Sequence, residues 1–515
     1  MSYSIDPHET LGEGIYRAMS ANNPEFPTGA CWELSNMVYN RSSEDPEKMG
    51  GFARLGSTDM GGTVAGLFDF AEGTALVACC LDGKIYQYAG SDFAVSTGAT
   101  GFTTTATDRW SGAMFYGATT AANLLILCNS KATDAPQKLV AAGHSALGGT
   151  PPTAGQFPVS WGGRLWMASG DTLFYSATND CEDWATNGGS IQIDRGSGSI
   201  TGLYVFAGNL LIFKRRKILR LLPGTSVAEQ SVREVSSRIG TPSYWSIQEG
   251  GSNKSGILMF MSDTGVQAMV PSGATGGFYL KPVADSIKSF LDRRTKTAQK
   301  SAWATYNEDR GEYYLQYVVA AAGTVPTEGV IGNMAREQGR IRWTTHDMAN
   351  MSAGATYRVS GAEIQVIGDS NGRVYQMHSG HDRAGSGFTG RVETPAYAQG
   401  QRGQMKRYGR VFVDLQTKGN YPVTARMILG RSGLPTSSAN TETIDTQGAA
   451  DGWGVGKWGV AKWGGSALSP EWIRPDASSR GSYMKCQFET TGRDMWYKLN
   501  GLQIEYALKR RILAA

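Results

Sequence analysis

The chain has 515 residues, of which 67 are glycine and only 18% are charged, and its formal net charge is +4. This length exceeds what one hydrophobic core usually supports, so two or more domains are expected. The charge is too mild to indicate a nucleic-acid-binding domain with a basic face, although it permits DNA to be held non-specifically inside a channel. No segment approaches the ~20 apolar residues of a membrane span, and the N-terminus lacks a secretory signal pattern. We therefore expect a soluble protein without membrane insertion.

The six cysteines are too few and too scattered for a disulfide framework in a chain of this length. None forms a C-x-x-C pair, and two adjacent cysteines lie inside an apolar run. We expect buried free thiols, made in a reducing cytoplasm. The residues are Cys31, Cys79, Cys80, Cys128, Cys181 and Cys486.

Residues 1–50 are rich in Asn, Pro, Ser and Glu and show little periodicity. Aromatic residues such as Phe26, Trp32 and Tyr39 are scattered among turn formers. This texture predicts an N-terminal arm that packs on another part of the protein rather than a self-contained element.

A loose repeat fills most of residues 51–388 and consists of an apolar strand, a turn with Asp, Asn or Gly, and a short second strand. Such turns between apolar runs favour hairpins. Copies near Phe174, Leu219 and Val266 are 45 and 47 residues apart (219−174 and 266−219), a spacing typical of four-stranded propeller blades. We predict an all-β fold with a β-propeller of about six blades, in which the apolar runs are inner strands buried between blades. The copies lie at residues 75–87, 123–127, 164–175, 209–219, 257–266, 313–317 and 364–376.

One short helix is predicted near residues 283–291. Pro282 precedes it, at a position where a missing N–H has no cost, and the apolar side chains of Val283, Ile287 and Leu291 fall on one face. We expect this helix to cover a blade edge.

Residues 389–515 show strict alternation of apolar and polar residues instead of continuous apolar runs. Four alternating strands, at 410–415, 423–429, 484–488 and 502–506, predict an appended C-terminal β-sandwich or platform domain. A long insert at 431–480 interrupts this domain, and an insert of that length is usually functional or interface-forming.

A search for catalytic chemistry yields no constellation, so we predict a non-enzymatic protein without metal or cofactor. His378 and His381 lie near Asp382, but a third protein ligand for a metal is not evident. The string G-x-S-x-G at 368–372 is followed by a strand rather than a helix, which favours a hairpin turn over a hydrolase nucleophile. Residues 262–265 resemble part of a sialidase Asp-box, and a hairpin turn again explains them better.

Two other features of the sequence are unusual enough to suggest a functional role. The first is a five-residue Trp-Gly repeat within the insert, which suits an interface or a tip of an assembly. Intradomain packing and sugar stacking are the alternatives. The candidate interface residues are Trp453, Lys457, Trp458, Lys462 and Trp463.

The second feature is clustered basic residues in two segments. A charge cluster is usually a solvated face, but in a ring of subunits such clusters multiply around a lumen and hold the DNA backbone without reading its sequence. The candidate lumen- or DNA-facing residues are Lys214, Arg215, Arg216, Lys217, Arg402, Lys406, Arg407 and Arg410.

The order of these features resembles the tail nozzle proteins of short-tailed bacteriophages, also called tail tubular protein B or DNA-stabilisation protein. The likeness rests on the N-terminal segment 32–41, the segments that follow Trp184 up to Lys214, the helix at 283–291 and the Trp-Gly insert. It spans nearly the whole chain. The proline of the family's Arg-Pro-Gly pattern is missing here, where Arg54-Leu55-Gly56 stands alone.

The resemblance implies a virion protein of the phage tail, assembled in the host cytoplasm as a homo-oligomeric ring of six. Such a ring contacts a tail adaptor on the capsid side and a tail fibre, spike or tip protein, and it conducts and gates packaged double-stranded DNA. The alternative is a carbohydrate-binding propeller that attaches to a cell-surface glycan through the insert tryptophans.

Overall fold

The computed structural model describes residues 3–508 apart from several short segments. The residues outside the description are 1–2, 9, 24, 40–43, 89, 118–122, 141–142, 223–230, 252–255, 274–276, 320–322, 324, 335–340, 360, 400–403, 420, 431–437, 445–467, 474–479 and 509–515. No helix in the described part of the chain is both long and apolar enough to cross a membrane.

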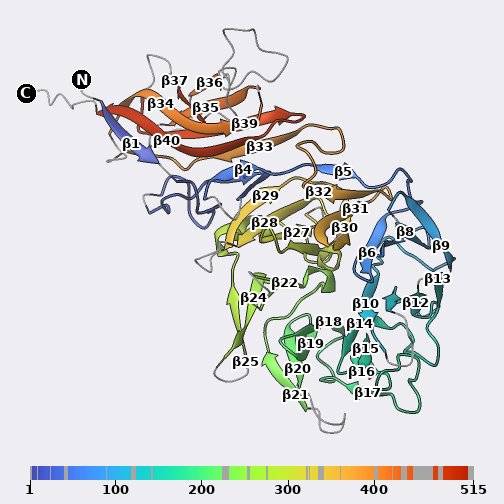
Figure 1. Ribbon diagram of the computed structural model, residues 1–515. Coiled ribbons are helices and arrows are strands. Elements are labelled where there is room, and N and C mark those ends of the chain that lie inside the picture. The colour runs from blue at the N-terminus through green and yellow to red at the C-terminus, as the bar shows by residue number, and fades with distance from the viewer. Residues whose placement is uncertain are drawn as a thin grey trace, which may run out of the picture.

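The predicted β-propeller is confirmed, and its described residues form seven blades rather than about six (Figure 1). Each blade is an antiparallel sheet of four strands. The first four are β6 (Val64–Phe70), β7 (Ala75–Cys80), β8 (Lys84–Tyr88) and β9 (Phe93–Thr100); β10 (Ser111–Phe115), β11 (Leu124–Cys128), β12 (Gln137–Val140) and β13 (Gly143–Ala146); β14 (Gln156–Trp161), β15 (Arg164–Ser169), β16 (Thr172–Tyr175) and β17 (Gly189–Gln192); β18 (Ile200–Phe206), β19 (Asn209–Lys214), β20 (Lys217–Leu222) and β21 (Ser231–Ser236).

The last three blades follow in chain order, except that the seventh takes its outer strand from the N-terminal region. They are β22 (Gln248–Gly250), β23 (Ile257–Ser262), β24 (Gly265–Ser272) and β25 (Gly277–Pro282); β26 (Trp303–Asn307), β27 (Glu312–Tyr317), β28 (Glu328–Met334) and β29 (Ile341–His346); β30 (Met351–Val359), β31 (Ala362–Asp369), β32 (Val374–Met377) and β5 (Phe52–Arg54). Phe52 pairs with Met377 and Arg54 with Tyr375, so the N-terminal region closes the ring.

The seven apolar runs of the sequence are the second strands of the blades, not the innermost strands. All residues of β7, β11 and β27 are buried, because a second strand has a sheet neighbour on each side and another blade over each face. The innermost strands are the first strands of the blades, and they are rich in small residues. At Gly354 of β30 an added Cβ would lie 2.3 Å from the ring of Trp303, so the close approach of β30 to β26 requires glycine.

The C-terminal β-sandwich consists of two sheets, and one of them is continuous with blade six. The order β26-β27-β28-β29-β2-β33-β39-β35-β36 forms a single sheet of nine strands. The other sheet has the order β3-β4-β40-β34-β37, and β1 and β38 pair with β40 and β34. The strands are β1 (Ser4–His8), β2 (Glu33–Ser35), β3 (Met37–Tyr39), β4 (Pro46–Lys48), β33 (Phe388–Glu393), β34 (Lys406–Thr417), β35 (Val423–Gly430), β36 (Ser438–Ile444), β37 (Leu468–Ile473), β38 (Arg480–Gly481), β39 (Tyr483–Gly492) and β40 (Tyr497–Leu508).

The N-terminal region contributes strands to the sheets of both domains. β2 lies between the last strand of blade six and the first strand of the sandwich, where Ser35 pairs in parallel with Thr345 and antiparallel with Arg391. The Asn36 N–H donates to the Thr345 carbonyl (2.7 Å), and the Asn36 side-chain amide donates to the Thr389 carbonyl (2.7 Å). One short segment thus joins the propeller to the sandwich.

The predicted helix is shorter than expected. It consists of a 3₁₀ turn, η3 (Asp285–Ile287), followed by one α-helical turn, α1 (Lys288–Leu291). Ile287 and Leu291 are buried as predicted, in a hydrophobic core that extends from blades five and six into the sandwich. Two further 3₁₀ turns, η2 (Tyr244–Ser246) and η4 (Gln299–Ser301), precede the inner strands of blades five and six.

Candidate functional site

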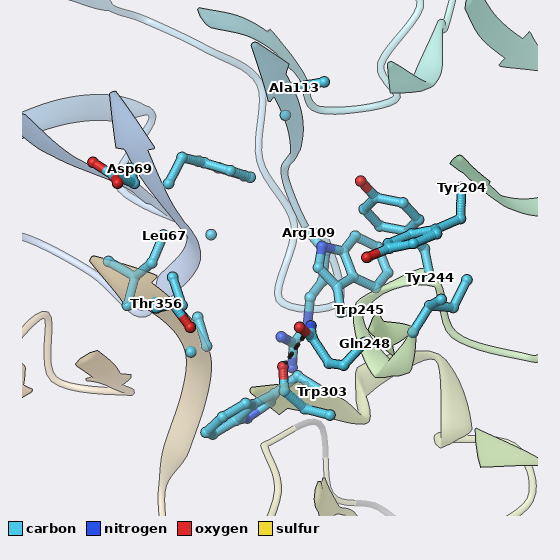
Figure 2. Close-up of a pocket in the computed structure, with 18 of the residues that line it drawn as sticks. Leu67, Asp69, Arg109, Ala113, Tyr204, Tyr244, Trp245, Gln248, Trp303 and Thr356 are labelled. Atoms are coloured by element: carbon cyan, nitrogen blue, oxygen red, sulfur yellow. Dashed lines mark hydrogen bonds between the residues drawn. The ribbon is translucent and has the colours of Figure 1, made fainter. Parts of the chain in front are cut away.

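The axis of the propeller contains a cavity of ≈350 Å³, surrounded by the inner strands of six blades (Figure 2). Its wall combines small residues with aromatic side chains. Figure 2 shows Tyr204, Tyr244 and Trp245 on one side of this cavity and Leu67 and Thr356 on the other. The cavity exists because the inner strands carry small side chains where they approach the axis.

A second cavity of ≈560 Å³ lies at one mouth of the axis, and we call it the mouth chamber. Its wall comes from the loops that lead into the inner strands and from turns that follow second strands. The polar and charged members of this wall are Thr107, Asp108, Arg109, Ser111, Ser130, Gln156, Ser197, Ser199, Thr201, Arg215 and Lys300.

Arg109 and Trp245 line both cavities and therefore form the waist between them. The indole N–H of Trp245 donates to the Trp110 carbonyl (2.7 Å), which fixes the ring across the axis. The Arg109 guanidinium carbon lies 5.6 Å from the centroid of this ring. Arg109 also donates to the backbone carbonyl of Ser301 in η4, so residues that precede the inner strands of blades two, five and six meet at this point.

Arg109 carries a positive charge that no carboxylate in the described residues neutralises. Its side chain is 9% exposed, and burial lowers its pKa to about 9. The adjacent Asp108 is paired with Lys131 at 2.8 Å instead. A buried guanidinium without an ionic partner is energetically costly, and such positions are candidates for function.

An aromatic cluster supports the waist. Phe157 packs against Tyr244 (ring centroids 5.0 Å apart) and against Trp245 (6.2 Å, edge to face). Its backbone φ is +54°, at a point where the register between β14 and β15 shifts. The left-handed region is unfavourable for a bulky side chain, so surrounding contacts must hold Phe157 there.

The predicted basic cluster at residues 214–217 forms the turn between β19 and β20. Arg215 lines the mouth chamber, and both Arg215 and Arg216 pair with Asp263 of blade five, at 3.2 and 3.3 Å. Lys217 pairs with Asp194 (2.7 Å) and with Glu234 (3.0 Å), so acidic neighbours offset much of the charge of this turn.

Two lysines of the predicted lumen-facing set are buried, which corrects their assignment to a charged surface. Lys214 is 0% exposed, and its ammonium donates to the carbonyls of Ile193 (2.7 Å) and Asp194 (2.9 Å). Lys406 is 1% exposed and donates to the carbonyl of Ser482 (2.9 Å). Both ammonium groups have found internal acceptors, so neither presents charge to a ligand.

The other predicted residues divide between exposed positions and segments outside the description. Arg407 and Arg410 of β34 are exposed, and Arg410 pairs with Glu505 of β40 at 3.3 Å. Arg402 lies outside the described residues, as do all five candidate interface residues: Trp453, Lys457, Trp458, Lys462 and Trp463.

The hydrolase-like strings are hairpin turns, as predicted. Ser370 lies in the turn between β31 and β32, where the Asp369 carboxylate accepts the backbone N–H groups of Asn371 and Arg373 (both 2.8 Å). Ser262 pairs with Gly265 across the two-residue turn between β23 and β24. Neither string has the strand–turn–helix setting of a nucleophile elbow.

His378 lies between blades six and seven, and its side chain is 12% exposed. It hydrogen-bonds Gln365 (3.0 Å), and its Nε2 lies 3.4 Å from the buried carboxylate of Glu312. Glu312 also accepts from Arg310 (3.0 Å) and from the Tyr314 hydroxyl (3.0 Å). This cluster holds blades six and seven together, and no group of three or more metal-ligating side chains occurs in the described part of the chain.

No family model and no curated protein sequence matches this chain. Among solved structures it is similar to U3-55K (TM-score 0.41, 8% identity, 64% of this chain and 98% of that chain). It is also similar to Raptor of Chaetomium thermophilum (TM-score 0.42, 11% identity, 68% and 30%) and to the WD40 repeats of RRP9 (TM-score 0.40, 9% identity, 63% and 99%). Similarity at this level says nothing about function.

Proposed function

We propose that this chain is a non-enzymatic structural subunit of a bacteriophage tail nozzle, which assembles into a ring that conducts and gates double-stranded DNA. The observation that carries the proposal is the nine-stranded sheet that runs from blade six through β2 into the sandwich. A conduit wall requires subunits that keep their shape under load, and a backbone-bonded sheet across a domain junction supplies such stiffness.

Packing at the junction supports the same role. One buried core includes Leu315 of blade six, Leu34 of β2 and Val413 of the sandwich. Domains that move relative to each other usually meet through small polar interfaces, whereas a continuous apolar core resists relative motion. A rigid two-domain body suits the repeated head-to-tail contacts that close a ring.

The proposed contact with DNA is electrostatic and sequence-independent. Among the predicted residues that the structure describes, Lys214 and Lys406 are buried, and the others have at least part of the side chain exposed: Arg215, Arg216, Lys217, Arg407 and Arg410. Three of these arginines have acidic partners, which reduce the positive electrostatic potential that they present. A weak positive potential fits a channel that must release DNA better than a channel that binds DNA tightly.

Imaging of the purified chain tests the proposal. Mass photometry over a hundredfold concentration range and negative-stain microscopy are expected to show closed rings with a central hole. A chain that stays monomeric throughout, and also in the presence of an adaptor ring from its own virion, would contradict it.

Substitution of Trp453, Trp458 and Trp463 by Ala distinguishes the nozzle from glycan attachment. Ring formation should be lost in the triple variant, whereas Tyr279→Ala, which removes an exposed aromatic side chain from β25, should leave rings intact. Retention of rings together with loss of binding to a glycan array would favour the carbohydrate-binding alternative instead.

A further inference from the structure

The waist of the propeller axis has hydrogen-bonding capacity that the protein itself does not use. The one hydrogen bond of the Arg109 side chain in the described structure goes from a terminal nitrogen to the Ser301 carbonyl. A guanidinium has five N–H donors, so several have no hydrogen-bond partner among the described residues, at a side chain that lines both cavities. Such a fork matches the oxygens of a carboxylate or phosphate.

The charges around the mouth chamber favour an anion. Lys300 of η4 is exposed at the chamber and has no ion-pair partner among the described residues. Asp108 is engaged by Lys131, and Arg215 is engaged by Asp263. Two cations of the wall, Arg109 and Lys300, therefore have no ion-pair partner among the described residues, whereas the one carboxylate of the wall, Asp108, is paired with Lys131.

The axial cavity behind the waist does not supply the missing negative charge. Its one acidic lining residue, Asp69, accepts the backbone N–H of Gly73 at 2.8 Å. That hydrogen bond holds the carboxylate at the end of β6, and no ion pair joins it to Arg109 within the described structure.

Two glycines in the wall of the chamber leave open space beside the backbone. Gly170 and Gly198 line the chamber with positive φ values, and a Cβ added to either would meet no atom within 4 Å. Ser197 and Ser199 flank Gly198, and the Ser197 hydroxyl donates to the Asp194 carbonyl (2.8 Å) and accepts from the Lys214 ammonium (2.7 Å). The left-handed Phe157 holds the aromatic side of the chamber, and strain of this kind concentrates at ligand sites.

We propose that the mouth chamber is a binding site for a small oxyanion-bearing ligand, a carboxylate or a phosphate, with Arg109 as the anchor at its base and Lys300 at its rim. The volume of ≈560 Å³ lies within the range of small-molecule sites. Trp245 and Phe157 supply an apolar surface beside the anchor. All the residues that line this chamber belong to one chain, so the proposal can be tested whether or not the ring forms.

Isothermal titration calorimetry at constant ionic strength tests the proposal with three probes: inorganic phosphate, glucuronate and glucose. At least one of the two anions should bind saturably with one site per chain, and glucose should not bind. The phosphate and glucuronate experiments separate a phosphate ligand from a carboxylate ligand. Absence of saturable binding by both anions would overturn the proposal.

Substitutions locate the binding. Arg109→Gln should weaken the affinity for the bound anion at least tenfold, which corresponds to about 1.4 kcal/mol. Lys300→Gln, at an exposed position that does not affect folding, should weaken it several-fold. Arg195→Gln removes an exposed arginine from the loop that also carries Ser197, and it should leave the affinity unchanged because Arg195 does not line the chamber.

The ligand-free stability of Arg109→Gln gives a second readout. Removal of a buried charge without an ionic partner should leave the melting temperature unchanged or raise it, whereas a purely structural arginine would lower it. Anion binding that is equally strong in Arg109→Gln and the wild type, or equally weakened in Arg195→Gln, would refute the assignment.

Discussion

Acid is expected to destabilise the protein through His346, the last residue of β29 at the junction between blade six and the sandwich. The side chain is 3% exposed, and neither ring nitrogen has a hydrogen-bond partner within the described structure. The ring occupies the space above Gly329 on β28, where an added Cβ would lie 2.3 Å from Nε2. Protonation would place a charge in this buried site, where the described structure provides no hydrogen-bond acceptor for it.

The sign and size of the effect follow from linkage. Burial, and to a smaller extent the nearby Arg383, lowers the pKa of His346 to about 3, whereas an unfolded histidine titrates near ~6.5. The unfolded state therefore binds more protons between these values, and stability is lost as the pH falls from 6.5 towards 3. At about 1.4 kcal/mol per pH unit, acidification from pH 7 to 4.5 costs roughly 2.5 kcal/mol from this residue alone.

Urea unfolding at several pH values between 7 and 4.5, followed by tryptophan fluorescence, measures how the free energy of unfolding depends on pH. His346→Phe keeps an aromatic ring beside Tyr314, and His346→Asn keeps a polar side chain, but neither titrates. The free energy of unfolding of both variants should fall by about 2.5 kcal/mol less than that of the wild type over this range. Equal acid sensitivity of the wild type and both variants would refute the reasoning.

Three further predictions concern the fold. Phe52→Ala should lower the free energy of unfolding by about 3 kcal/mol in urea, because Phe52 of the ring-closing strand packs edge to face on Tyr375 (5.0 Å); no change would mean that β5 does not close the ring. Gly354→Ala should cost about 1–3 kcal/mol, since its Cβ would collide with Trp303, whereas Gly273→Ala, with open space around the new Cβ, should be nearly neutral. All six cysteines are free and buried, so a thiol reagent such as DTNB should label none of them in the native protein and all six after denaturation; rapid native labelling would contradict this burial.

The sequence predicted the propeller hairpins because they are local. The turn Asp82-Gly83 between β7 and β8 and the strand Leu124–Cys128 show their conformations in a few consecutive residues. The innermost strands gave a weak signal, since glycines such as Gly66 and Gly112 replace the side chains that would mark them. The apolar second strands were therefore recognised as strands buried between blades, whereas the first strands at the axis were not, and the number of blades was underestimated.

Contacts between segments that are distant in the chain could not be predicted from local sequence patterns. β5 has three residues and pairs with β32 more than 300 residues later, which no composition or spacing indicates. The same holds for the site. Arg109 is not part of a basic cluster, and it meets Trp245 only when the ring closes, whereas the conspicuous cluster at 214–217 contains a lysine that the fold uses internally.

The position of β2 between blade six and the sandwich has a mechanical consequence. A pull or torque applied to the sandwich reaches the propeller through β2, which pairs antiparallel with β33 of the sandwich and parallel with β29 of blade six, so it loads backbone hydrogen bonds in shear rather than peeling them apart one at a time. The propeller and the sandwich of one chain then move together as one rigid body. In a ring of such chains, the central passage would widen when neighbouring chains slide against each other, while the internal structure of each chain stays unchanged.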